Sequence, residues 1–134
     1  MSCASKIVDM EDYNPSQTPP PEEWLELDEL SRISMVLEYH EATGAEMDEE
    51  AMNLHSMLHV VVENQLAANV VPVPATMARL IRQGLSRHEA IHAIAGVLAE
   101  DLFDILKNKR EFDAKRYRIR LNKLTAKRWR KRKW

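Results

Sequence analysis

The chain has 134 residues and a formal net charge of −2, and 45% of its residues are hydrophobic. This length fits one domain, and this hydrophobic share is sufficient for a packed core. Only three glycines occur, which disfavours a turn-rich β sandwich or barrel. The single cysteine, Cys3, excludes a disulfide within the chain, as suits a reducing cytoplasm.

The apolar stretches are too short or too interrupted for membrane insertion. The first ten residues contain no apolar signal-peptide region, and charged, amide and proline residues interrupt the longest apolar runs further on. We therefore expect a cytoplasmic protein without a membrane-spanning segment.

The predicted elements are helices. Prolines at positions 15 and 19–21 predict a disordered leader over residues 1–20. Apolar residues at helical spacing then predict helices over residues 21–43, 48–68, 74–84 and 86–109, where Ser86 and Glu89 have the spacing of a capping box.

The remaining residues, 110–134, form a basic C-terminal segment. Tyr117, Leu121 and Leu124 are spaced as on a helix, whereas Tyr117, Ile119 and Leu121 alternate with arginines as on a strand. Because no partner strand is apparent elsewhere, we expect a helix. The predicted fold is all-α: a single small helical domain of four to five helices, with the main helical part over residues 21–109, the leader before it and the basic segment after it.

The net charge conceals a strong polarity along the chain. Residues 1–106 contain 5 Lys and Arg against 19 Asp and Glu, a net −14, and residues 107–134 contain 14 against 2, a net +12. Such asymmetry indicates a basic segment that binds an anionic partner or that docks on the acidic part of its own chain, in particular the acidic first helix.

Two histidine pairs are the main chemical signal. The second predicted helix carries His55, His59 and Glu63 four residues apart, and the fourth carries His88 and His92 at the same spacing. Side chains four apart share a helix face, with Cβ atoms roughly 5–6 Å apart, so each pair is able to bind one metal ion.

Ligands of this type favour zinc, nickel, iron or copper over magnesium or calcium. The alternative is that the histidines are hydrogen-bonded residues in a helix interface, and the pattern leaves both readings open. His40 has no histidine four residues away, so we expect its loss to matter little unless the end of the first helix folds over the site.

The segment from His88 to His92 also matches the zinc peptidase pattern HExxH, in which a glutamate acts as general base. A five-residue match is common by chance, and Glu89 already has a structural role in the expected capping box. The segment from Glu89 to His92 resembles half of a di-iron motif, but the second half is absent from the sequence.

At these residues the chain resembles a family of small bacterial domains of unknown function, common in proteobacteria. The matching motifs are His55-x3-His59-x3-Glu63-x-Gln65, then His88-Glu89-x-x-His92 and a closing Leu124-Thr-Ala-Lys-Arg-Trp129. The resemblance spans roughly residues 50–129. It implies a bacterial source and one shared constellation of His, Glu and Gln residues, but no activity.

The end of the chain mixes cations with tryptophan: Lys127, Arg128, Trp129, Arg130, Lys131, Arg132, Lys133 and Trp134. Phosphate contacts and stacking would suit RNA or single-stranded DNA. The alternative is a helix whose cations face water while Tyr117, Leu121, Leu124 and Trp129 pack inward.

The sequence thus predicts an uncharacterised helical protein that binds a transition metal through His55, His59, Glu63, His88 and His92. The second hypothesis is a nucleic-acid-associated or protein-adaptor module acting through the basic segment, and the third is a zinc metallohydrolase. No substrate and no oligomeric state follow from the sequence.

Overall fold

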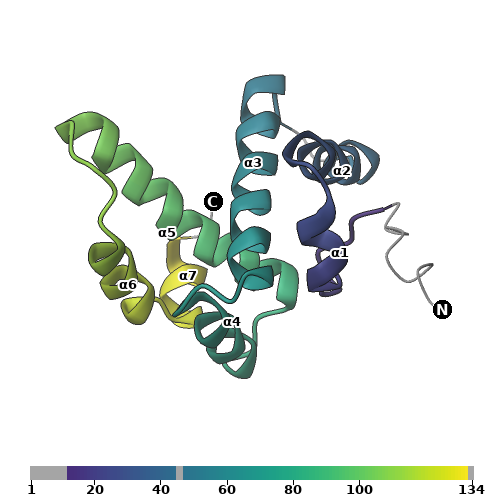
Figure 1. Cartoon of the computed structure of the whole chain (residues 1–134). Helices are drawn as coiled ribbons and strands as arrows, with labels where there is room; N and C mark the ends of the chain where they lie inside the picture. The colour runs from purple at the N-terminus through teal and green to yellow at the C-terminus, as the bar shows by residue number, and fades with distance from the viewer. Residues whose placement is uncertain (1–11, 45–46, 133–134) are drawn as a thin grey trace. The chain divides into compact units, whose positions relative to one another are not determined.

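The computed structural model describes residues 12–44 and 47–132. These ranges contain helices and no strands, so the predicted all-α fold is confirmed (Figure 1). The helices are α1 (Pro21–Glu26), α2 (Glu29–Ala42), α3 (Glu49–Ala67), α4 (Val73–Arg82), α5 (Arg87–Asn108), α6 (Ala114–Lys123) and α7 (Ala126–Arg132). The described part therefore has seven helices rather than four to five, because two of the expected helices are divided.

The first division follows from capping at Asp28. A single helix was expected over residues 21–43, but Leu27 and Asp28 have extended backbone conformations between α1 and α2. The Asp28 carboxylate accepts a hydrogen bond of 2.7 Å from the backbone N–H of Ser31. Asp28 thus starts a new helix as its N-cap.

The chain divides into two compact units, Met1–Ala68 and Asn69–Trp134, here called the N-terminal and C-terminal units. The division at residue 68 is additional to the boundaries expected at residues 20 and 109, which stay predictions. None of the described helices is long and apolar enough to cross a membrane.

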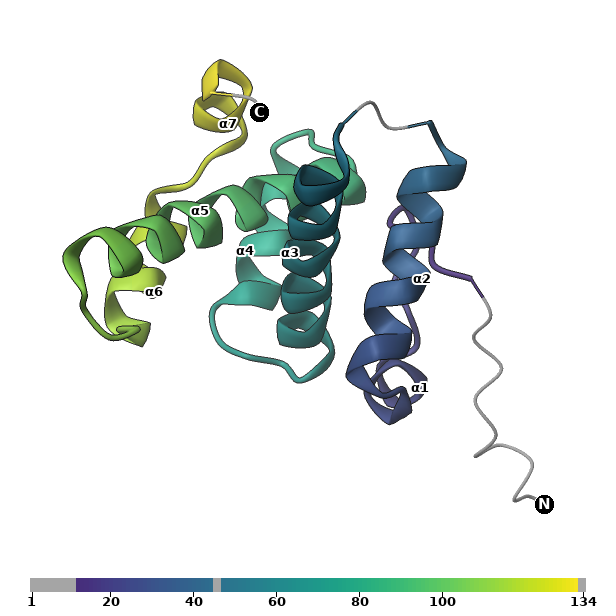
Figure 2. The same ribbon diagram turned by 90° about the horizontal axis from the view of Figure 1, so that it is seen from above.

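The N-terminal unit packs α1 and α2 against α3, and α2 runs beside α3 in Figure 2. Its core contains Tyr13, Trp24, Val36 and Val60. The Trp24 indole N–H donates to the Asn64 side-chain oxygen at 2.8 Å, which fixes the buried ring of α1 to α3. A buried Trp with its N–H satisfied contributes a large apolar area without leaving a polar atom unpaired.

Tyr13 lies in the segment expected to be a disordered leader. Residues 12–20 contain no helix, as their prolines predicted, but the Tyr13 side chain is only 3% exposed. At least this part of the segment therefore belongs to the packed structure. Residues 1–11 of the expected leader, including Cys3, lie outside the described residues.

The C-terminal unit is built on the long helix α5, which contacts α4, α6 and α7. Its most buried apolar side chains come from three helices and include Leu80, Ile91, Ile94 and Leu121. α5 ends at Asn108, within the predicted range, and Lys109 caps it in the left-handed conformation with φ 51°. The helix choice for the basic segment is also correct, since α6 and α7 form there.

The break between α6 and α7 has side-chain support from α4. Leu124 is extended, so carbonyl groups near the end of α6 need partners outside the helix. The Arg79 guanidinium donates to the carbonyls of Leu121 at 2.9 Å and Leu124 at 2.8 Å, and the Gln83 side chain accepts from the Ala126 N–H at 2.8 Å. These bonds explain why two short helices replace the expected single one.

Candidate metal centre

Helix α3 places the first histidine pair and Glu63 on one face. Asp48 caps the helix by accepting from the Ala51 N–H at 2.8 Å, so the register that aligns positions 55, 59 and 63 is set from its first turn. His59 and Glu63 are 0% and 1% exposed, and His55 is half-buried. The rings of His55 and His59 have centroids 4.9 Å apart, as the spacing predicted.

His40, at the end of α2, joins this pair. Its ring centroid lies 4.6 Å from that of His55 and 4.7 Å from that of His59, and the side chain is 3% exposed. We expected the loss of His40 to matter little unless the end of this helix folds over the histidines of the next one. The end of α2 does lie over His55 and His59, so that condition is met. The N-terminal unit therefore holds a cluster of three imidazoles, here called the histidine cluster: His40, His55 and His59.

The environment of His40 favours a neutral, oriented ring. Burial lowers the pKa of His40 below its ordinary value of 6.5, and this effect outweighs the opposing hydrogen bond to the Val36 carbonyl. Nδ1 lies 2.8 Å from that carbonyl oxygen, which has no proton to donate, so Nδ1 carries the hydrogen. In the neutral ring Nε2 then has the lone pair that a metal ion needs.

The geometry suits a shared ion. One ring nitrogen of His40 and one of His59 lie within 4.8 Å of each other. Two nitrogens bound to zinc at about 2.0–2.1 Å are necessarily closer than this limit, so a modest side-chain rotation would be sufficient to bring both to one ion. The described N-terminal unit is thus compatible with metal binding.

Glu63 interacts with the cluster through Tyr13. The Tyr13 hydroxyl lies 2.5 Å from Oε2 of Glu63 and 3.1 Å from Nδ1 of His59. Glu63 was predicted as a direct ligand. Its Oε2 accepts the hydrogen bond from Tyr13, and the ligand role stays a prediction. Tyr13 was not predicted to take part in any site.

The second histidine pair lies in the first two turns of α5, in the C-terminal unit. The ring centroids of His88 and His92 are 4.3 Å apart with an interplanar angle of 62°, and both side chains are half-buried. One ring nitrogen of each lies within 4.8 Å of the other. The pair predicted from the spacing is therefore present as a local two-nitrogen site.

Glu89, between these histidines, caps the helix as predicted. The Ser86 hydroxyl accepts from the Glu89 N–H at 3.1 Å, and the Glu89 carboxylate accepts from the Ser86 N–H at 3.0 Å. Both halves of the capping box are formed. A general-base role for Glu89 would require this carboxylate to leave the helix N-terminus.

The basic end docks within its own unit through apolar side chains. Tyr117, Leu121, Leu124 and Trp129 are all buried, at 4%, 0%, 9% and 6% exposure. The prediction that these four side chains pack inward, made as the alternative to nucleic-acid binding, is therefore confirmed. Four of the predicted nucleic-acid-binding cations face water: Lys127, Arg128, Arg130 and Lys131. Lys133 and Trp134 lie outside the described residues, as does the side chain of Arg132.

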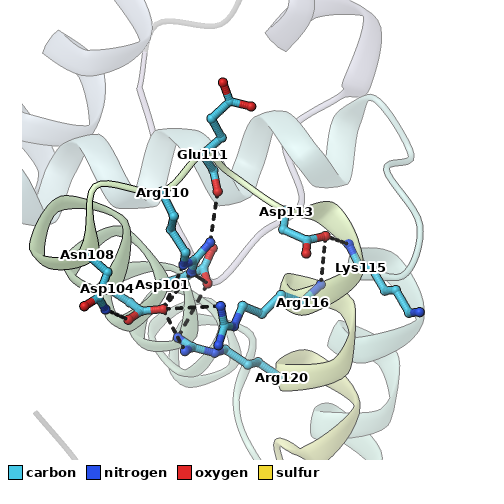
Figure 3. Close-up of polar contacts among 9 residues, drawn as sticks. All are labelled: Asp101, Asp104, Asn108, Arg110, Glu111, Asp113, Lys115, Arg116 and Arg120. Carbon is cyan, nitrogen blue, oxygen red and sulfur yellow. Dashed lines mark hydrogen bonds and ion pairs between the residues drawn. The ribbon is translucent and has the colours of Figure 1, made fainter.

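Counter-ions of the basic segment come from α5 (Figure 3). Asp101 is 0% exposed, and its Oδ1 lies 2.8 Å from Arg110 and 3.5 Å from Arg120. Asp104 pairs with the same two arginines and with Arg116 at 3.8 Å. The expectation named the acidic first helix as the docking partner, but within the C-terminal unit two aspartates of α5 have this role. We call these five residues the aspartate–arginine network.

Comparison with known proteins identifies a family and no function. A sequence-family model described as a domain of unknown function (DUF1841) matches residues 27–123. This range contains all five histidines, whereas Tyr13 and α7 lie outside it. No curated protein and no solved structure matches the chain significantly.

Proposed function

The chain belongs to the DUF1841 family of domains of unknown function, and we propose that it is a protein that binds a transition metal ion through its histidines. The observation that carries the proposal is the histidine cluster of α2 and α3, whose ring centroids lie 4.6–4.9 Å apart. Three imidazoles gathered from two helices are more than hydrogen bonding in a core requires.

The chemistry of the cluster favours neutral imidazoles around a bound metal cation over three protonated imidazoles packed together. Three protonated imidazoles at these distances would repel one another strongly in a buried setting. Burial lowers the pKa of His40, so its neutral form, which is the metal-binding form, is favoured. A metal ion would replace the hydration that the buried ring nitrogens have lost.

The prediction from the sequence that His88 and His92 also bind metal stays part of the proposal. Zinc sites in proteins are most often four-coordinate, and a cluster of three rings leaves at least one such position open. The second pair offers further nitrogen ligands on a preformed helical turn. Nitrogen-rich ligation favours zinc, nickel, iron or copper, and Glu63 is the oxygen ligand that the sequence predicts.

The test is the metal content of the full, tag-free chain purified without chelator. Elemental analysis should find a stoichiometric transition metal, or the chelator-treated protein should show a raised Tm on addition of one of the four metals, because binding to the folded state stabilises it by mass action. Protein without bound metal, whose Tm none of the four metals changes, would contradict the proposal.

Variants identify the ligands. The double change His59→Ala with His88→Ala should abolish tight binding, and either change alone should leave weaker binding. His40→Ala should now weaken binding as much as His59→Ala does. Glu50→Ala, at an exposed position of the same helix α3, is the matched control and should bind like the wild type.

A second function remains as a separate proposal for the water-facing cations of α7. Lys127, Arg128, Arg130 and Lys131 are exposed on one short helix, and Trp129 packs inward, so phosphate contacts are favoured over base stacking. Binding of a single-stranded oligonucleotide should then weaken steeply with salt. An anisotropy titration without binding at low salt would remove this candidate.

A further inference from the structure

We propose that Tyr13 is a positioning residue for the metal site: it connects the Glu63 carboxylate to His59 and fixes which nitrogen of His59 receives the metal. The inference rests on the proposed function and deepens it. It concerns a residue from a segment outside the matched family region, 27–123, so it assigns a role that the family motifs do not contain.

The hydrogen bonds define the direction of the relay. Tyr13 has one hydroxyl proton, and the carboxylate of Glu63, 2.5 Å away, is an acceptor when ionised. The hydroxyl proton therefore points to Glu63. The hydroxyl oxygen is then the acceptor for Nδ1 of His59 at 3.1 Å, so Nδ1 carries a hydrogen.

This direction sets the tautomer of His59. With the hydrogen on Nδ1, the lone pair of the neutral ring is on Nε2, so Nε2 is the nitrogen that can bind a metal ion. His40 has the same arrangement, with its Nδ1 hydrogen on the Val36 carbonyl. Metal-bound histidines commonly donate their second N–H to a carboxylate or carbonyl, and here a tyrosine lies between the histidine and its carboxylate.

Packing holds Tyr13 in place. Its ring contacts Trp24, Tyr39 and His59, with centroids 5.8, 6.0 and 6.0 Å away. The turn that follows is closed by the Asn14 side chain, which accepts from the Ser16 N–H at 2.9 Å. All three members of the relay are nearly inaccessible, at 3%, 0% and 1% exposure for Tyr13, His59 and Glu63. Water is therefore a poor substitute for the lost hydroxyl.

The test compares Tyr13→Phe with the wild type in the full chain. Tyr13→Phe keeps the ring and removes only the hydroxyl. We expect unchanged metal stoichiometry with a dissociation constant raised by about 10- to 100-fold, as for other outer partners of metal-bound histidines. Tyr39→Phe is the matched control, because it removes a hydroxyl from a ring that packs against Tyr13, and its effect on the dissociation constant should stay well below about 10-fold.

A second readout separates positioning from general packing. In the metal-free wild type, nitrogen NMR shifts of His59 should show a protonated Nδ1 and an unprotonated Nε2, and Tyr13→Phe should give a mixture of tautomers. Glu63→Gln, a second variant of the relay, should shift the tautomer in the same direction. A wild-type tautomer with the hydrogen on Nε2 would overturn the inference.

The outcomes distinguish the two proposals. If the wild type binds metal and Tyr13→Phe matches it in affinity and tautomer, the positioning role is wrong and the metal site stands. If the wild type binds none of the four metals, the proposed function fails, and the positioning role fails with it.

Discussion

The two units gather polar side chains in opposite ways. The histidine cluster of the N-terminal unit collects three imidazole rings, and hydrogen bonds to Tyr13 and Val36 orient the two buried ones, His59 and His40. The aspartate–arginine network of the C-terminal unit collects full charges of both signs, and Asp101 is buried only together with Arg110 and Arg120. The first arrangement offers lone pairs to a cation, and the second neutralises itself. A structural role is therefore sufficient for the network, whereas for the cluster we propose metal binding.

The largest expected effect tests the structural reading of the C-terminal unit. Trp129→Ala should lower the free energy of unfolding by about 3–5 kcal/mol, because it empties a buried aromatic position. The neighbouring Lys127→Ala should change it by about 0.5 kcal/mol or less, since Lys127 faces water. Chemical denaturation measures both. Equal effects for the two variants would show that α7 does not dock through its tryptophan.

The next effect sharpens the comparison by adding metal. At a free metal concentration about 100-fold above the dissociation constant, the wild type should gain about 2.7 kcal/mol by mass action. The gain should disappear as the pH falls through about 6.5, because protonated imidazoles do not bind metal. Arg110→Ala, which breaks the network, should keep the whole gain. A gain lost in Arg110→Ala but kept in His59→Ala would reverse our assignment of roles.

A smaller effect tests Glu89 as a helix cap. Ser86→Ala and Glu89→Ala should each lower stability by about 0.5–2 kcal/mol. Glu89→Gln should retain much of the capping box, since glutamine also serves at this position. Thermal unfolding of the three variants measures this. Loss of a hydrolytic activity in Glu89→Gln at unchanged stability would instead support the metallohydrolase hypothesis.

The smallest effects are the pH dependences of the metal-free protein, and they should fall in separate windows. Burial lowers the pKa of His40, which faces the rings of Tyr39, His55 and His59. Below pH 6.5, the ordinary pKa of histidine, the unfolded chain therefore binds more protons than the folded one. The free energy of unfolding should fall as the pH drops from 6.5 toward the lowered pKa of His40.

In the C-terminal unit, the hydrogen bond from Arg110 is the main cause that lowers the pKa of Asp104. The stability that Asp104 contributes is complete above its ordinary value of 3.8 and is lost as the pH falls further through the lowered pKa. His40→Gln should weaken the loss of stability below pH 6.5 and leave the loss below pH 3.8 roughly unchanged. Asp104→Asn should do the reverse, and unfolding curves measured across both ranges test this.

Helical periodicity was sufficient to predict the local parts of the candidate site. His55 and His59, and likewise His88 and His92, lie on single helices, so a spacing of four residues fixes each pair. The capping box was predictable for the same reason. The all-α fold followed from apolar spacing, and the break at Asp28 was missed because a continuous apolar pattern conceals a capping aspartate within it.

The members that the sequence did not predict are those that only tertiary packing brings in. His40 reaches the cluster because α2 runs beside α3 (Figure 2). Residue spacing within one helix cannot predict which other helix packs against it. Tyr13 lies 46 residues before His59 in a segment without regular structure. The sequence shows Tyr13 only as an aromatic residue next to a proline-rich segment, and the composition of that segment predicted disorder rather than burial.

The buried Asp101 has a consequence for the order in which the protein is made. Its counter-ions, Arg110 and Arg120, follow it in the chain, the first of them nine residues later. A nascent chain that has released α4 and α5 from the ribosome but neither Arg110 nor Arg120 would have to bury an uncompensated carboxylate, which is strongly unfavourable. The C-terminal unit therefore becomes stable only after synthesis has passed these two arginines. Chains that terminate before Arg110 lack this compensation and leave the face of α5 that contacts α6 uncovered, which makes them prone to aggregation.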